Sequence, residues 1–120
     1  MRHLILMIVS LLLSLPSHAS SQIPKSFLGL WDANADACEK QYSDMRLRIS
    51  LSAIEYWESS GNLLEIIESK HSSLIARFVF RGEGESWERK ITYFLLNEQR
   101  ELVQVFDDGM RVSRVRCTDA

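Results

Sequence analysis

Alternation between apolar and polar residues begins after Ser43 and limits this chain to a mainly β fold. Over 46–51 the apolar residues Leu47, Ile49 and Leu51 alternate with Arg or Ser, as a strand with one face in water requires. Further strands rich in Ile, Val, Phe, Tyr and Trp are predicted at 54–59, 62–69, 74–81, 86–96, 101–106 and 110–117.

Short runs of turn-forming residues separate these strands, at 59–61, 71–73, 81–85, 97–100 and 107–109. Connections this short require antiparallel pairing, because parallel strands need crossovers of about a dozen residues or more. Closure would remove the exposed sheet edges. We therefore expect an antiparallel meander that closes into a small barrel of about seven to eight strands. Its interior would be filled by Leu47, Ile49, Leu51, Ile66, Phe78 and Phe80.

The first 19 residues have the pattern of an export signal. A basic start at Arg2 precedes an almost wholly aliphatic run over 4–15, and small residues end at Ala19. The run is shorter than the roughly 20 residues that span a bilayer, so we expect cleavage after Ala19 rather than the alternative, an uncleaved anchor. The product would be periplasmic or secreted, with no integral membrane span.

Cleavage would leave two parts, a flexible polar arm over 20–26 and a single domain over 27–120. One short helix is expected near the start of the domain, capped by Asp32 or Asn34 and continuing to about Tyr42.

The charge balance excludes some partners. The chain has 14 basic and 16 acidic residues, and loss of Arg2 with the signal leaves 13 against 16, a net charge of −3. Nucleic acids and anionic membranes both need a basic surface, so neither is expected as a partner.

Two cysteines, Cys38 and Cys117, remain after cleavage. In an oxidising compartment such a pair most simply forms one structural disulfide. The alternative is a reactive thiol pair, which would ordinarily have Cys-x-x-Cys spacing.

Catalytic chemistry has little support in the residues. His71 is the one histidine left after cleavage, and it lies in a predicted turn, where it would be solvated rather than part of a triad or zinc site. Glu83 and Glu85 flank Gly84 in another predicted turn, and turn carboxylates of this kind are usually solvated. No catalytic residue, metal or cofactor is predicted.

Binding is the more plausible role for the residues around the same turn. Glu83, Glu85 and Trp87 could contact a basic partner. Trp57 falls on the opposite face of its predicted strand from Tyr56. Such aromatic residues either cover the barrel ends or form an exposed patch for a ligand or protein. The arginines of the later strands are expected to face outward, namely Arg77, Arg81, Arg89, Arg111, Arg114 and Arg116.

The segment Gly29-Leu30-Trp31, together with Arg114 and Arg116 in the last predicted strand, resembles the Gly-x-Trp motif and late arginine of the lipocalin and calycin group. The resemblance implies that Trp31 closes one barrel end and that one of the two arginines packs across its ring. Such a cation–π contact would make Gly29, Trp31 and the arginine structural.

In size, export signal and N-terminal arm, the chain also resembles the small periplasmic inhibitors of secreted bacterial proteases. That resemblance implies that residues 20–26 enter a protease cleft.

We therefore expect an exported, non-enzymatic binding protein with a protein partner, in particular an inhibitor of a secreted or periplasmic hydrolase. The alternative is a lipocalin-like carrier of a small apolar ligand. A carrier would need several hundred Å3 of open interior, on the order of a ligand pocket, and we expect the packed barrel to have no such cavity.

Overall fold

The structure is a computed structural model that describes residues 22–118. The predicted export signal lies outside this range. Within it the chain forms one 3-10 turn, η1 (Lys25–Phe27), one short helix, α1 (Ala35–Glu39), and eight strands. The strands are β1 (Gly29–Asp32), β2 (Leu47–Ile49), β3 (Ala53–Glu55), β4 (Ser60–Ser69), β5 (Ser73–Gly82), β6 (Glu85–Leu96), β7 (Glu101–Phe106) and β8 (Arg111–Arg116).

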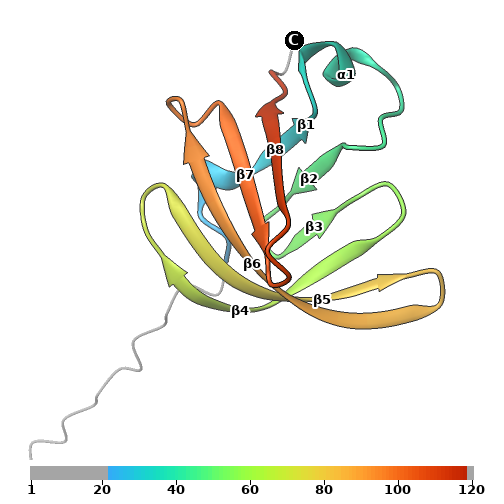
Figure 1. Cartoon of the computed structure of the whole chain (residues 1–120), viewed down its shortest axis with the longest axis vertical. Helices are drawn as coiled ribbons and strands as arrows, with labels where there is room; N and C mark the ends of the chain where they lie inside the picture. Colours follow the sequence, from blue (N-terminus) through green and yellow to red (C-terminus); the bar gives the residue numbers. More distant parts are fainter. Residues whose placement is uncertain (1–21, 119–120) are drawn as a thin grey trace, which may run out of the picture.

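The strands form a closed antiparallel barrel, in which each strand pairs with the next in sequence and β8 returns to β1 (Figure 1). Trp31 lies opposite Arg116 across this closing seam. The predicted fold class is confirmed. The sequence pattern gave no signal for β1, because four residues are too few to show a period.

Two strands are shorter than predicted. Ser50 donates its backbone N–H to the carbonyl of Ala53 at 2.9 Å, which makes a tight turn directly after β2. Leu51 lies in this turn and is 42% exposed, so its predicted place in the core is wrong. β3 ends at Glu55, and the chain leaves the sheet where the sequence predicts a continuing strand.

The barrel interior is tightly filled. The inward residues of β5 and β6 alternate with outward ones, and Ile66 on β4 packs against the cluster while partly exposed. The most deeply buried apolar side chains are Ile23, Phe27, Trp31, Leu47, Ile54, Leu74, Ala76, Phe78, Ile91, Tyr93 and Leu102.

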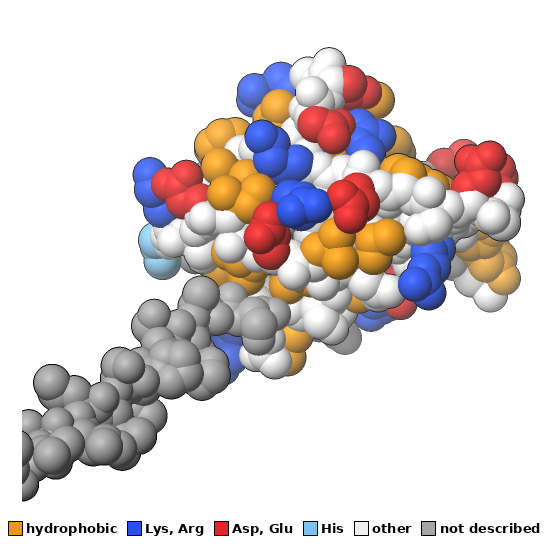
Figure 2. Space-filling view, turned by 90° about the horizontal axis from the view of Figure 1, so that it is seen from below, with side chains coloured by type: hydrophobic (Ala, Val, Ile, Leu, Met, Phe, Trp, Pro, Cys, Tyr) orange, Lys and Arg blue, Asp and Glu red, His pale blue; other side chains and the backbone are white. Residues whose placement is uncertain are grey.

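The outer surface of the barrel carries charged side chains among small clusters of apolar residues. Figure 2 shows one face of the molecule with acidic and basic side chains interspersed among separate groups of hydrophobic ones. Arg77 on β5 bridges Glu65 and Glu88 on the neighbouring strands, at 2.8 and 2.9 Å. This surface is typical of a wet sheet face.

The segment before β1 closes one end of the barrel. Ile23 is 1% exposed and donates its N–H to the carbonyl of Leu51 at 2.8 Å, and Phe27 is fully buried. This packing differs from the flexible arm predicted over 20–26, because Ile23 and Phe27 supply buried apolar side chains for the barrel end while Gln22 and Lys25 stay exposed.

Arg116 ties this end together. Its guanidinium lies 4.2 Å from the centroid of the Trp31 ring and donates to the carbonyls of Ser26, Leu28 and Gln99. The Trp31 indole N–H donates to the carbonyl of Phe27 at 3.0 Å. The contact that the resemblance implies is therefore present at this end, and Arg116 is the arginine that packs across the Trp31 ring.

Gly29 opens β1 at a φ of +124°, a backbone conformation that side chains rarely adopt. A side chain there would also meet Arg116, whose Nη1 would lie 3.4 Å from the added carbon. Glycine thus lets the chain enter the barrel beside the arginine.

Arg114 does not face outward as predicted. It is 5% exposed and donates to the side-chain carbonyl of Gln104 inside the barrel. Because Arg114 and Arg116 are two residues apart on β8, they share the inner side of the sheet. The outward face predicted for the arginines of the last strand is therefore wrong for Arg114.

α1 is capped as expected, but it is shorter than predicted. The side chain of Asn34 accepts from the N–H of Ala37 at 2.8 Å. The helix ends at Glu39 rather than near Tyr42, because Arg46 takes the carbonyls of Ala37 and Lys40, each at 2.7 Å. An isolated helix of this length depends on such tertiary contacts.

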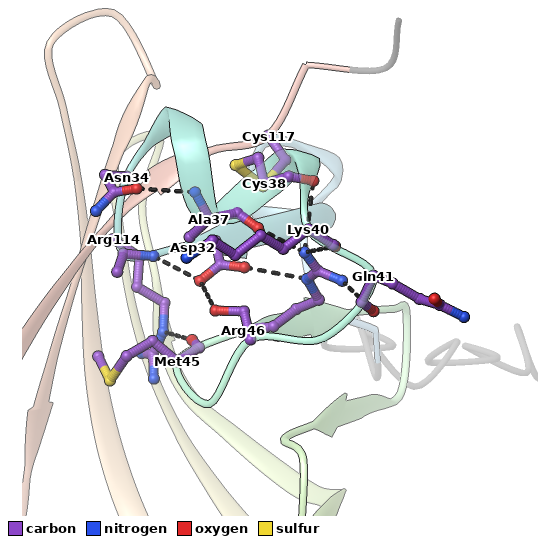
Figure 3. The surroundings of a disulfide bond; sticks show 12 residues. Asp32, Asn34, Ala37, Cys38, Lys40, Gln41, Met45, Arg46, Arg114 and Cys117 are labelled. Carbon is purple, nitrogen blue, oxygen red and sulfur yellow. Dashed lines mark hydrogen bonds and ion pairs between the residues drawn. A yellow bond between two sulfur atoms is a disulfide. The ribbon is translucent and has the colours of Figure 1, made fainter.

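The predicted disulfide is confirmed. Cys38 at the end of α1 is bonded to Cys117 directly after β8, 79 positions further along the chain (Figure 3). It joins α1 to the closing strand of the barrel.

Replacement of both cysteines, Cys38→Ala with Cys117→Ala, is expected to lower the free energy of unfolding by about 4 kcal/mol, because a long loop in the unfolded chain is no longer closed. Urea unfolding followed by circular dichroism measures the difference. Wild-type protein unfolded by urea in the presence of a reductant should have the same free energy of unfolding as the variant. Equal stability with and without the bond would contradict the assignment.

Candidate functional site

The opposite end of the barrel is open. A cleft of about 530 Å3 lies there, lined by residues of the α1–β2 connection, the β3–β4 turn and strands β5, β6 and β7. We call it the mouth cleft. Its lining residues are Asp44, Tyr56, Trp57, Glu58, Ser59, Phe80, Trp87, Arg89 and Phe106. The barrel below it is filled by packed side chains, so this space is an open cleft at the mouth and not an enclosed interior cavity.

Aromatic rings form the floor and one wall of the mouth cleft. Phe80 and Trp87 are paired across β5 and β6, and their rings stack with centroids 5.8 Å apart and planes 11° apart. Tyr56 packs on Phe80 at 6.1 Å. Gly61 allows this packing, since an added Cβ would lie 2.9 Å from the Phe80 ring. The ring stack gives the cleft a fixed apolar surface.

Trp57 stands at the rim and is 56% exposed. Tyr42 from the α1–β2 connection meets it edge to face, with ring centroids 5.0 Å apart. Because the strand ends at Glu55, Tyr56 and Trp57 both line the cleft, whereas a continuing strand would have placed them on opposite faces. The predicted face assignment is wrong for Trp57.

A buried polar layer supports the floor. Gln104 is fully buried, donates to the hydroxyls of Tyr56 and Tyr93 at 2.8 and 3.2 Å, and accepts from Arg114. Burial raises the pKa of Tyr56 and raises that of Tyr93 well above its ordinary value. Both phenols stay neutral at physiological pH, and the hydrogen bond from Gln104 positions the Tyr56 ring.

Arg89 forms the far wall. Its guanidinium lies 5.1 Å from the centroid of Phe106 and pairs with Asp107 at 2.9 Å and Asp108 at 3.5 Å. The two aspartates lie in the β7–β8 turn. Asp107 and Asp108 thus neutralise the charge of Arg89 at the rim of the barrel.

A smaller hollow of about 220 Å3 adjoins the cleft, and Trp87 lines both. We call it the acidic hollow. Its lining is Glu58, Ser59, Gly82, Glu83, Glu85 and Trp87.

The structure thus gathers all four residues predicted for partner binding at one end of the barrel. Trp57 and Trp87 line the mouth cleft, and Glu83 and Glu85 line the acidic hollow beside it. The sequence analysis did not single out the other cleft residues as site residues, namely Asp44, Tyr56, Glu58, Ser59, Phe80, Arg89 and Phe106. Their shared signal is that each lies within a few residues of a turn at the same barrel end.

The α1–β2 connection is held by one buried carboxylate. Asp32, fully buried at the end of β1, accepts from Arg46 Nε at 3.0 Å, Ser43 Oγ at 2.7 Å and the N–H of Ala33 at 2.8 Å (Figure 3). Burial alone would raise the pKa of Asp32, but the hydrogen bonds and the charge of Arg46 outweigh it and hold the pKa below 3.8. The same connection supplies Tyr42 and Asp44 to the mouth.

No constellation typical of metal chemistry is found in the described part of the chain, where no three His, Cys, Asp or Glu side chains are placed to hold an ion. His71 lies exposed between β4 and β5, at the end away from the cleft. The site offers aromatic surface, carboxylates and an arginine that is paired with two aspartates.

Fold and site together define a small, closed, antiparallel β-barrel with one plugged end and one open aromatic end. The chain has no significant match among protein-family models, curated proteins or solved structures. Over residues 22–118, no helix has the length and apolar character to cross a membrane.

The variant Asp32→Asn is expected to lose about 3 kcal/mol of stability at pH 7, because it leaves Arg46 without its buried partner. A carboxyl with a depressed pKa stabilises the fold above the ordinary value of 3.8, and this contribution is lost as the pH falls below it. Wild-type stability should therefore fall more steeply between about pH 4 and pH 2 than that of the variant.

Urea unfolding at a series of pH values measures both effects. The matched control is Asp36→Asn, an exposed aspartate in the first turn of α1, which should cost less than about 1 kcal/mol and keep the wild-type slope. If the stability of Asp32→Asn fell with decreasing pH as steeply as that of the wild-type protein, the proposed role of the Asp32 carboxylate would be refuted.

Proposed function

We propose that this chain is an exported, non-enzymatic binding protein whose mouth cleft receives a large apolar side chain from a protein partner. The observation that supports it is the concentration of five aromatic rings around one open cleft of about 530 Å3. Trp, Tyr and Arg dominate the energetics of protein interfaces, and the cleft has all three, as Trp57, Trp87, Tyr56 and Arg89.

The openness of the site favours a protein partner over an enclosed small molecule. Trp57 is 56% exposed and Trp87 is 37% exposed, and the barrel beneath them is filled by packed side chains. Small-molecule sites commonly bury about 70–90% of their ligand, which this shallow arrangement does not favour. A side chain that projects from a partner surface needs no such enclosure.

Two features support an oxidising location, periplasmic or secreted. The sequence starts with the pattern of an export signal, and the Cys38–Cys117 disulfide is of the kind that persists outside the cytosol.

Inhibition of a secreted or periplasmic hydrolase is the specific form of binding that we propose. The small barrel resembles the periplasmic protease inhibitors of the lipocalin-like group in architecture, although their disulfide closes a short segment and the Cys38–Cys117 bond spans nearly the whole domain. Because Ile23 and Phe27 are packed into the barrel, the contact surface would be the mouth rather than the N-terminal segment.

A lipocalin-like carrier of a small apolar ligand is the second candidate. The volume of the mouth cleft favours it, since about 530 Å3 lies within the range of roughly 300–1,000 Å3 seen for ligand pockets.

Native mass spectrometry of the protein isolated gently from the exported fraction separates the two functions. We expect a complex with a second protein, and we expect Trp57→Ala and Trp87→Ala each to weaken it by about 30-fold or more, as truncation of an interface hot spot does. Phe94→Ala is the matched control, because Phe94 is 38% exposed on the outer face of β6 and should leave binding unchanged.

A small-molecule adduct that both tryptophan variants lose would support the carrier instead. A bare monomer, or a protein complex that survives both variants, would contradict the proposed role of the cleft.

A further inference from the structure

Trp87 joins the mouth cleft to the acidic hollow. Its ring stacks on Phe80 and lines both spaces, as do Glu58 and Ser59 of the β3–β4 turn. A group seated in the cleft and a group seated in the hollow would therefore lie next to each other, in contact with a shared indole ring.

The hollow exists because two turns approach closely at a glycine. A Cβ on Gly82 would lie 2.9 Å from the backbone carbonyl of Glu58 and 3.1 Å from the side chain of Ser59. The absence of a side chain lets the β3–β4 turn lie against the β5–β6 turn. This contact brings Glu58 beside Glu83 and Glu85 around one hollow.

The carboxylates of the hollow are not neutralised within the described chain. Over residues 22–118, Glu58, Glu83 and Glu85 take part in no salt bridge, whereas Glu65 and Glu88 on the barrel wall share Arg77. Solvated like charges held side by side repel one another, so a cation placed among them is attracted.

Two arginines lie near the acidic hollow, but the hollow keeps a net negative charge. Arg89 is paired with Asp107 and Asp108. Arg81 shares a separate surface hollow with Glu58 and does not line the acidic hollow. The hollow thus has a net negative charge next to an aromatic ring, which is the combination that favours ammonium and guanidinium groups.

We propose that the partner of this barrel presents a large apolar side chain together with a lysine or arginine close to it in sequence. The apolar side chain fills the mouth cleft, and the cation enters the acidic hollow against Trp87 and the three glutamates. This inference rests on the proposed function and specifies the chemistry of the partner.

The geometry also limits the spacing of the two groups. The cleft and the hollow share Trp87 as a wall, and an extended chain advances about 3.3 Å per residue. The basic residue therefore lies within about three positions of the apolar one in an extended partner segment.

The test selects binding peptides from a random library displayed on phage, with the wild-type chain as target. Parallel selections use Glu83→Gln with Glu85→Gln, and Trp57→Ala with Trp87→Ala. The control, Glu68→Gln with Glu98→Gln, removes the same charge from exposed residues of β4 and the β6–β7 turn. Circular dichroism establishes that every variant is folded.

We expect wild-type selections to converge on an aromatic or large aliphatic residue with Lys or Arg within three positions. A peptide of this type should bind the Glu83/Glu85 variant about fivefold more weakly at low salt, and the Glu68/Glu98 variant within about twofold. The loss should shrink as salt is added.

Two other results separate the inference from the proposed function. Wild-type selections that converge on apolar residues with neutral or acidic neighbours, and that require Trp57 and Trp87, would overturn the basic preference and leave the function standing. An absence of any selected sequence, or sequences that bind the tryptophan variant equally well, would overturn both.

Discussion

The buried carboxylate of Asp32 links the closing strand of the barrel to the segment that shapes its mouth. It ends β1, which pairs with β8, and it accepts hydrogen bonds from Ser43 and Arg46 in the α1–β2 connection. A buried charge without partners is costly, so the connection has to fold back over the barrel wall to supply them. Arg46 in turn holds the carbonyls at the end of α1, next to the disulfide. The residues that follow α1 then meet Trp57 at the mouth.

The two barrel ends have different tasks because their side chains differ. At one end Ile23, Phe27 and Trp31 fill the interior, and Arg116 fastens the chain across the seam. This end contributes stability. At the other end the rings stop short of filling the space, and the buried amide of Gln104 separates the packed core from the open cleft. Because one end is filled and the other is open, a domain of about one hundred residues keeps one solid core and still presents a binding surface.

Much of the fold follows from local sequence, and the site follows only in part. Period-two alternation and short polar turns were sufficient to predict an antiparallel barrel, since they fix strand direction and connection length. Periodicity could not say which face of β8 is inward, so Arg114 was placed in solvent, although it pairs with Gln104 in the interior. It also could not show that β3 stops at Glu55, and this early end is what turns Trp57 into the cleft. The acidic hollow depends on a long-range approach at Gly82, for which a single sequence has no signal.

The central claim is that binding occurs at the aromatic mouth, and the three tryptophans of the chain provide a direct test. Their indole N–H resonances can be followed by nuclear magnetic resonance while a bound partner or a selected peptide is added. Trp57 and Trp87 line the cleft, whereas Trp31 is buried at the other end and bonded to Phe27. The account predicts that the signals of Trp57 and Trp87 shift in proportion to occupancy and that the signal of Trp31 stays in place. Binding that moves Trp31 alone, or none of the three, would contradict it.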